Sequence, residues 1–231
     1  MNTKPSTTAA GADTTTLVDG AYQAIRRRIL DNVWAPGYQA MEQEIALQLG
    51  MSRTPVHEAL MRLHGEGLIE VIPRRGMRVL PVSPTAMREI YEILGALESA
   101  AAESLARRKP DAAELQPLVE ATETMAAALQ ANDLDAWARA DESFHAQLVT
   151  MAGNKLLADA VFNHWDRAHR ARMVSLRLRP VPHNSTQEHM ELVERIREGD
   201  AEGAARVNLE HRRRASRELL AIFEHYRFQH L

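Results

Sequence analysis

One carboxylate and three imidazoles occupy positions where the helical pattern of the sequence expects apolar side chains. Asp141 and His145 share the apolar stripe of one predicted helix, and His189 and His211 lie on the apolar stripes of two later ones. Ionisable groups on a buried face cost several kcal/mol unless they are paired. Asp141 and His145 are four residues apart, and groups at that spacing on a helix can meet one ion.

These four residues predict a divalent-metal site. Three helices that turn nitrogen and oxygen ligands inward can converge on one site in the core of a bundle. One Asp and three neutral His suit Zn²⁺, with Ni²⁺ or Mn²⁺ as alternatives, and the sequence has no cysteine to supply a thiolate. The residues alone leave a second interpretation open, in which Asp141 and His145 form a buried ion pair and the other two histidines are ordinary half-buried residues.

Two further polar side chains lie on apolar stripes. Arg172 shares a stripe with Trp165 and Ala168, and Asn208 shares one with His211. An inward arginine either pairs with a core acid or anchors the carboxylate of a ligand. Arg172 and Asn208 are therefore the candidate effector-binding residues.

The elements that must position these side chains are helices. After Ser83-Pro84 the helical pattern continues to the end of the chain, and it is interrupted only by short breaks. Asp111 and Glu114 have the spacing of a capping box at one of these helix starts. The expected helices span residues 84–108, 111–131, 134–151, 155–178, 186–198 and 201–227.

The N-terminal part of the sequence predicts a different unit. Residues 42–49 form a short predicted helix, Gly50-Met51 forms a tight turn, and Ser52–Leu68 forms a second helix with Ser52 as its cap. Two short helices joined by a tight turn are typical of a helix-turn-helix, whose second helix enters the major groove of DNA. The polar residues that lie off the apolar stripe of this second helix, toward solvent, are Arg53, Thr54 and His57.

Two β-rich runs follow, at residues 69–72 and 77–80, and they flank Pro73-Arg74-Arg75-Gly76, which predicts a hairpin. A helix-turn-helix followed by a hairpin is a winged helix, and its wing would carry Arg74 and Arg75 to phosphates or to the minor groove. The whole chain has a net charge of −3, yet arginines outnumber acids between residues 21 and 80. This distribution favours a DNA-binding head on a body that does not bind DNA.

The expected fold class is mostly α, with an N-terminal winged helix-turn-helix and a C-terminal all-α six-helix bundle. We expect a disordered tail at residues 1–15, the winged-helix domain at 16–82 and the helical domain at 83–231. The sequence has neither a signal-peptide pattern nor an apolar run long enough to cross a bilayer. A cytoplasmic protein without a membrane partner is therefore expected.

The segment from Tyr22 to Leu80 resembles the winged-helix domain of GntR-type bacterial transcription regulators. The specific match is LGMSRTPVHEALMRLHGEGLI followed by RRG. The helical remainder resembles the FCD-type effector domain of the FadR-like branch, and its six helices are similar to those of the VanR-like subgroup. The positions that carry this second resemblance are Asp141-x-x-x-His145, Gly153-Asn154, Glu188-His189, Gly199-Asp200-Ala201 and His211.

This resemblance implies a ligand-responsive transcriptional regulator, acting as a repressor, with no enzymatic activity. Such a protein is a homodimer that binds a palindromic DNA operator. A small carboxylate metabolite that binds its helical domain changes the affinity for that operator. The resemblance also implies that the helical domain dimerises and that Asp141, His145, His189 and His211 hold the metal. The candidate DNA-binding residues are Gln43, Ser52, Arg53, Thr54, His57, Arg74, Arg75 and Gly76.

The sequence departs from the family pattern at two positions. Position 57 is usually arginine and is His57 here, which offers fewer hydrogen bonds to a guanine and depends on protonation. Position 94 often carries an arginine thought to grip the ligand carboxylate and is Leu94 here. Arg172 could take over that role, with an aromatic acid as one conceivable ligand because Trp165 and Phe162 are close in sequence.

Two alternative functions use the same residues. The first keeps the DNA-binding head but makes the metal ion itself the signal, with no organic effector. The second is a metal-dependent hydrolase fused to a DNA-binding head, which needs an open coordination position and usually a nearby general base. The sequence has no H-E-x-x-H arrangement, and Asp141 is already used as a ligand.

Overall fold

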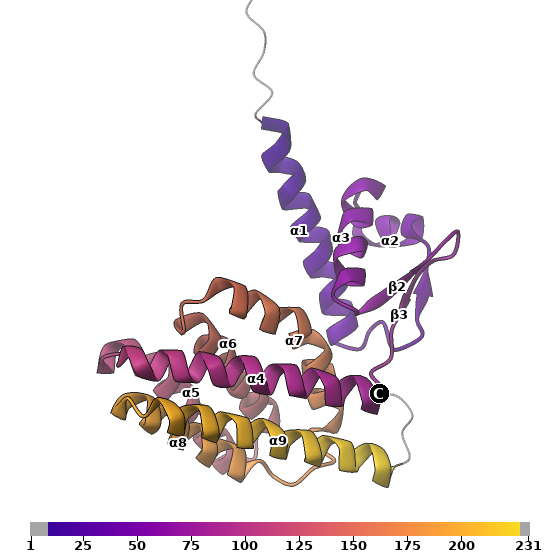
Figure 1. Cartoon of the computed structure of the whole chain (residues 1–231). Coiled ribbons are helices and arrows are strands. Elements are labelled where there is room, and N and C mark those ends of the chain that lie inside the picture. Colours follow the sequence, from indigo (N-terminus) through magenta and orange to yellow (C-terminus); the bar gives the residue numbers. More distant parts are fainter. Residues whose placement is uncertain (1–8, 227–231) are drawn as a thin grey trace, which may run out of the picture. The chain divides into compact units, whose positions relative to one another are not determined.

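The computed structural model of this 231-residue chain describes residues 9–226, with side chains described from residue 16 onward. The chain divides into two compact units, Met1–Pro81 and Val82–Leu231 (Figure 1). Each unit has its own apolar core. The expected fold class is confirmed, because a winged helix-turn-helix with a small sheet precedes a bundle of six helices.

From residue 9 onward, the first unit forms three helices and a three-stranded antiparallel sheet of order β1-β3-β2. Its first helix begins at Ala9, inside the expected tail of residues 1–15, because three of the four residues 9–12 are alanines, which favour a helix despite Gly11. Residues 1–8 of the expected tail lie outside the described part of the chain. The elements are α1 (Ala9–Leu30), β1 (Gln39–Ala40), α2 (Glu42–Leu49), α3 (Arg53–Gly65), β2 (Ile69–Ile72) and β3 (Gly76–Val79).

Helix α3 buries its predicted apolar stripe, since Val56, Leu60 and Leu63 are almost inaccessible to solvent. Ser52 is its N-cap residue, as expected, but the Ser52 side chain makes no capping hydrogen bond. A capping side chain accepts from the N–H of the second or third helical residue, and the third residue here is Pro55, which has no N–H.

The wing hairpin forms at the predicted place, with Ile72 opposite Gly76 in the register. The two-residue strand β1 on the other side of β3 was not predicted, because two residues are too short to show a periodicity. Gly76 has φ +83°, and a Cβ there would lie 2.1 Å from the carbonyl oxygen of Ala40. A glycine is therefore required where β1 passes the end of the wing.

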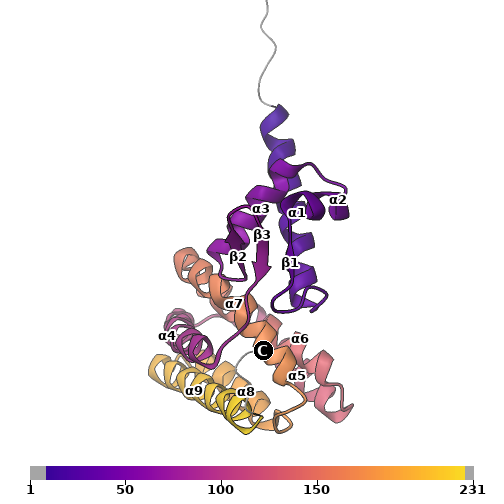
Figure 2. The same ribbon diagram turned by 90° about the vertical axis from the view of Figure 1, so that its right-hand side faces the viewer.

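The described residues of the second unit form six helices, as expected. Figure 2 shows their arrangement from another side. Asp111 and Glu114 form the predicted capping box, with N–H···O distances of 2.9 and 3.1 Å. The helix expected to begin at residue 186 begins at His183, and the one expected to end at residue 178 ends at Ser175. The helices are α4 (Pro84–Arg108), α5 (Ala112–Gln130), α6 (Leu134–Met151), α7 (Lys155–Ser175), α8 (His183–Glu198) and α9 (Ala201–His225).

Helices α4 and α9 run side by side in opposite directions along this unit (Figure 1). One part of the apolar core lies mainly among α5, α6 and α8, and another lies where α7 packs with α4 and α9. Helix α6 contributes Phe144 and Leu148 to the first part, with both side chains fully buried. This packing turns one face of α6 into the interior of the bundle. No helix in the described part of the chain is long and apolar enough to cross a membrane.

Candidate metal centre and DNA-recognition surface

Helices α6, α8 and α9 bring three imidazoles together in the interior of the second unit. One nitrogen each of His145, His189 and His211 lies within 4.8 Å of the other two. The Nε2 atoms of His145 and His189 are 3.2 Å apart. All three side chains are buried, with at most 4% of any residue exposed. The apolar stripes on three separate helices therefore meet at one point, as the sequence predicted.

Asp141 completes this cluster on one side. Its Oδ1 atom lies 3.7 Å from Nε2 of His145 and 3.8 Å from Nε2 of His189. Its Oδ2 atom accepts a hydrogen bond of 2.9 Å from the Arg172 guanidinium, which also lies near the Trp165 ring. One carboxylate oxygen thus faces the imidazoles while the other is held by an arginine of α7.

Two more carboxylates lie behind the imidazoles. Oε2 of Glu188 is 2.7 Å from Nδ1 of His211, and Arg214 holds the same carboxylate. Oε2 of Glu98 is 3.2 Å from Nδ1 of His145, although the angle does not give a hydrogen bond. In metalloproteins a carboxylate that accepts the outer N–H of a histidine fixes the ring and its tautomer. The other ring nitrogen, Nε2, is then left to face the cluster.

Burial controls the charge of these groups. It lowers the pKa of His145 and His189 well below the ordinary value for histidine, and neighbouring positive charges such as Arg212 lower it further. Burial alone would raise the pKa of Asp141, but Coulombic interactions with His145, Arg172 and other neighbours outweigh burial and lower it. Neutral imidazoles beside an ionised carboxylate are the protonation states that a metal ion requires.

The donor set fits a divalent cation. Two nitrogens that each bind one tetrahedral Zn²⁺ at its usual bond length are roughly 3.3 Å apart, and the two Nε2 atoms here are separated by 3.2 Å. Nδ1 of His145 and Nδ1 of His189 are buried and have no hydrogen-bond partner in the described part of the chain. A cation on the Nε2 side would fix both rings as Nδ1–H tautomers.

The pair of Glu98 and Arg212 was not singled out from the sequence. Glu98 is completely buried and Arg212 is 2% exposed, and two hydrogen bonds of 2.6 and 2.7 Å join them. Glu98 follows Leu94 by four residues and precedes Ala101 by three, so it lies on the apolar stripe of α4. The rule that identified Asp141 would therefore have identified Glu98 as well.

The predicted effector-binding residues lie on two sides of the metal candidate. Arg172 is beside Asp141, whereas Asn208 is buried and donates to Ser99 Oγ at 3.2 Å. Leu94 is buried in the apolar core and offers no group for a carboxylate. The cavity beside Asp141 and Arg172 has a volume of only about 10 Å³. A cavity of this size holds at most one water molecule, so side chains must move before a carboxylate ligand can enter.

In the first unit, the start of α3 carries the predicted base-reading side chains. The side chains of Arg53 and His57 are 70% and 54% exposed, and Thr54 is also exposed. Both Arg53 and His57 face Glu42 of α2, at 3.8 and 2.8 Å from its two carboxylate oxygens. Glu42 occupies Nδ1 of His57, so Nε2 is the ring nitrogen that can contact a base while this pair is kept.

The other predicted DNA contacts lie on the same unit. Gln43 on α2 and Ser52 before α3 are both exposed. Arg74 and Arg75 are exposed at the tip of the wing, and Gln39 Nε2 donates to the carbonyl oxygen of Arg75 at 3.2 Å. This contact ties β1 to the wing tip. Exposed cations on a supported hairpin are suited to bind phosphates.

Comparisons with known proteins match both units. Residues 17–79 match the family described as bacterial regulatory proteins, gntR family, and residues 89–214 match the FCD domain. The chain is 54% identical over 137 residues to an uncharacterized HTH-type transcriptional regulator in the TAR-I ttuE-ttuC' intergenic region of Agrobacterium vitis. That alignment covers 58% of this chain and 80% of the relative.

A second relative is named as an HTH-type transcriptional repressor, and two solved structures have the same fold. The HTH-type transcriptional repressor RspR of Escherichia coli K12 is 27% identical over 190 residues, which cover 82% of this chain and 83% of RspR. The structure of E. coli McbR/YncC has a TM-score of 0.74 at 22% identity and covers 91% of this chain and 98% of its own. A GntR transcriptional regulator from Rhodococcus sp. RHA1 has a TM-score of 0.72 at 20% identity, with 89% and 98% covered. Both structures share the fold.

Proposed function

Because the chain belongs to the gntR family of bacterial transcriptional regulators and carries an FCD domain, we propose that it is a metal-dependent, carboxylate-responsive repressor. In this proposal the dimeric protein binds a palindromic operator through its winged helices. The relatives are named as transcriptional regulators and not as enzymes, so the chain is a regulator and the hydrolase hypothesis is not retained.

The convergence of three buried imidazoles with Asp141 supports the metal part of this proposal. His145, His189 and His211 would hold the cation together with Asp141, and zinc is the first candidate because its nitrogen-rich preference suits this set. The bound cation would supply a positive charge that attracts an anionic ligand. The ionised Asp141 and the His211 ring held by Glu188 prepare the site for that cation, and Glu98 lies close to Nδ1 of His145.

Arg172 supports the carboxylate part of the proposal. It replaces the cation that family members often carry at position 94, and it already holds a carboxylate, that of Asp141. A ligand carboxylate would compete with Asp141 for the same guanidinium, because an arginine binds carboxylates through paired N–H groups. The small volume of the adjacent cavity means that this exchange would move the side chain of Arg172.

A thermal-shift experiment on the full chain tests the metal site. We expect Zn²⁺ at a hundredfold excess over its Kd to add about 2.7 kcal/mol to the free energy of unfolding. For a unit of this size that is a rise in Tm of roughly 5–10 °C, and chelator should reverse it. His189→Ala should abolish the rise, whereas His183→Ala, an exposed histidine on the same helix, should retain it.

The same assay with small mono- and dicarboxylates tests the effector. A carboxylate that raises the Tm only when zinc is present, and not in Arg172→Ala, would support the complete proposal. A Tm that responds to neither zinc nor chelator, in the wild type as in His189→Ala, would show that the four residues form only a structural polar core. In that case the chain would remain a DNA-binding regulator with a different signal.

One observation favours a second function, in which the metal ion alone is the signal. The cavity beside the cluster, at about 10 Å³, has room for no organic ligand as the side chains stand. Zinc titration against operator affinity without any carboxylate separates the two proposals. A full change in DNA affinity with zinc alone supports metal sensing, and a change that also needs a carboxylate supports the effector.

A further inference from the structure

Two side chains at the start of helix α3 reach the same carboxylate of helix α2. Arg53 and His57 are four residues apart, so they lie on one face of α3. Nδ1 of His57 is 2.8 Å from Oε1 of Glu42, and the Arg53 guanidinium is 3.8 Å from Oε2. The Glu42 carboxylate therefore lies against the part of α3 that a helix-turn-helix turns toward the bases.

Helix α2 holds this carboxylate in place. Glu42 is the first residue of α2, and a negative charge is favoured at the N-terminus of a helix. The Glu42 side chain is only 23% exposed, whereas that of His57 is 54% exposed. The carboxylate is therefore the supported partner in this pair, and the ring is the member that faces outward.

The contact with Glu42 determines which nitrogen of His57 carries a proton. An ionised carboxylate can only accept hydrogen bonds, so the donor in this contact is Nδ1–H of the ring. In a neutral imidazole with a proton on one nitrogen, the other nitrogen is an acceptor. Nε2 of the neutral His57 ring therefore presents a lone pair and not an N–H.

The arginine beside this pair favours the neutral form of the ring. Arg53 is always charged, and its guanidinium already faces the second oxygen of Glu42. A charged ring would place a second cation on the same carboxylate, and the two cations would repel each other. A free imidazole is also mostly neutral at about pH 8.

The four bases differ in what they offer such an acceptor in the major groove. Adenine presents the N6 amino group and cytosine presents the N4 amino group, and both groups donate. Guanine presents O6 and N7, and thymine presents O4, and all of these atoms accept. A lone pair on Nε2 can therefore accept a hydrogen bond from adenine or cytosine, whereas an arginine donates two to guanine.

We propose that His57 recognises an amino base, adenine or cytosine, through an Nε2 acceptor that Glu42 fixes. Glu42 is the positioning residue, since it acts on the base only through the Nδ1–H of His57. The operator then carries an amino base at the position where an arginine at residue 57 would require guanine. This inference rests on the proposed function only for DNA binding by the winged helix, and it needs neither the metal nor the carboxylate effector.

Selection from a duplex DNA library of random sequence tests the proposal. Duplexes that bind the full-length protein at about pH 8 are enriched and sequenced, and the selection is repeated with His57→Arg. The position read by residue 57 is the one at which the two proteins differ. We expect the wild type to favour adenine or cytosine there by about fivefold, the effect of one hydrogen bond, and His57→Arg to favour guanine.

Two further variants separate a positioning role of Glu42 from a structural one. The amide of Glu42→Gln can donate to Nδ1 as well as accept from it, so either ring nitrogen can then carry the proton. The preference for amino bases should disappear at this one position, and the preferences at the other operator positions should stay. Glu58→Gln removes the exposed carboxylate of the next residue on α3 and should keep the wild-type preference.

The nitrogen NMR shifts of the imidazoles measure the tautomer directly. The His57 signals are those that His57→Arg removes, and we expect the Nδ1–H form in the free wild type and more of the Nε2–H form in Glu42→Gln. An Nε2–H form in the wild type, or selection of guanine or thymine by it, would overturn the proposal.

The selections alone can also refute the role of Glu42 or of His57. An unchanged preference in Glu42→Gln would remove Glu42 from base recognition, and identical selections by the wild type and His57→Arg would remove His57. A wild type that enriches no sequence would overturn operator binding itself, which is a different result from any of these.

Discussion

Replacement of Glu98 by leucine separates the stability of the helical bundle from the organisation of its metal site. Glu98 is completely buried and makes two short hydrogen bonds to Arg212, which is itself 2% exposed. Glu98→Leu leaves the Arg212 charge in the interior without its partner. The loss of one member of a buried ion pair typically costs 3–5 kcal/mol, so we expect about that decrease in the free energy of unfolding.

A second effect of this substitution concerns zinc. Glu98 Oε2 lies 3.2 Å from Nδ1 of His145, on the side of the ring away from the other ligands. Loss of such an outer carboxylate usually lowers metal affinity by about 10- to 100-fold. The double variant Glu98→Leu/Arg212→Met removes both charges and should regain most of the stability, because apolar replacements of a buried pair are often neutral. It should not regain the zinc affinity.

Denaturant unfolding with chelator, together with zinc titration against a competing chromophoric chelator, measures both quantities. The double variant is the informative sample. Because it should remain folded, a loss of zinc affinity in it could not be caused by unfolding. Zinc affinity equal to that of the wild type in this variant would show that Glu98 does not orient His145. An unchanged unfolding midpoint in Glu98→Leu would show that Arg212 is not a buried charge that depends on Glu98.

Three further predictions concern the wing, the start of helix α3 and the dependence of stability on pH. Gly76→Ala should destabilise the protein to denaturant by more than Gly37→Ala, because both have φ above +80° but only Gly76 has a carbonyl oxygen in the way of a Cβ; equal losses would refute the clash. Arg53→Ala should lower operator affinity by about 1–3 kcal/mol in a gel-shift titration, and an equal loss on random DNA would refute a base-reading role. Burial holds the pKa of His145 and His189 well below that of unfolded histidine, so below about pH 6.5 the unfolded state binds more protons. The metal-free protein should therefore lose stability from pH 7 to pH 5, and a flat profile would contradict neutral imidazoles.

Local signals in the sequence were sufficient to predict most of the helices. Asp111, Asp133 and Asn154 each accept a hydrogen bond from the backbone at the start of a helix, and such caps involve only neighbouring residues. Ser52 shows where this reasoning fails, since the proline three residues later removes the N–H that its hydroxyl would bind. The side chain alone did not determine the cap.

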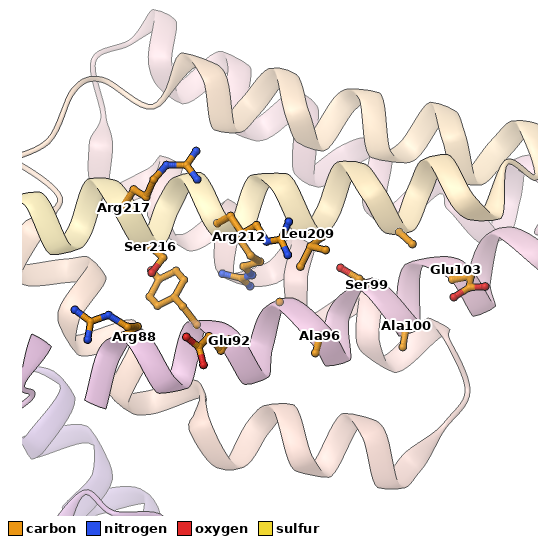
Figure 3. Close-up of a pocket in the computed structure, with 14 residues that line it drawn as sticks. Arg88, Glu92, Ala96, Ser99, Ala100, Glu103, Leu209, Arg212, Ser216 and Arg217 are labelled. Carbon is orange, nitrogen blue, oxygen red and sulfur yellow. The ribbon is translucent and has the colours of Figure 1, made fainter. Parts of the chain in front are cut away.

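The cluster of imidazoles could be predicted because helical periodicity places polar residues on buried faces. The partners of those residues could not, because they depend on which helices are neighbours. Glu98 of α4 contacts Arg212 of α9 across 114 positions of sequence. The groove between α4 and α9 on the outside of the second unit (Figure 3) was missed for the same reason, whereas strand β1 was missed because its two residues show no periodicity.

The position of Arg212 has a thermodynamic consequence. Its guanidinium is held by the carboxylate that backs His145, and the same residue lies in the wall of the outer groove between α4 and α9. One side chain thus connects the proposed metal site with the outer surface of the bundle. Coupling between two binding events is reciprocal, so any factor by which zinc would tighten a ligand of this groove is also the factor by which that ligand would tighten zinc.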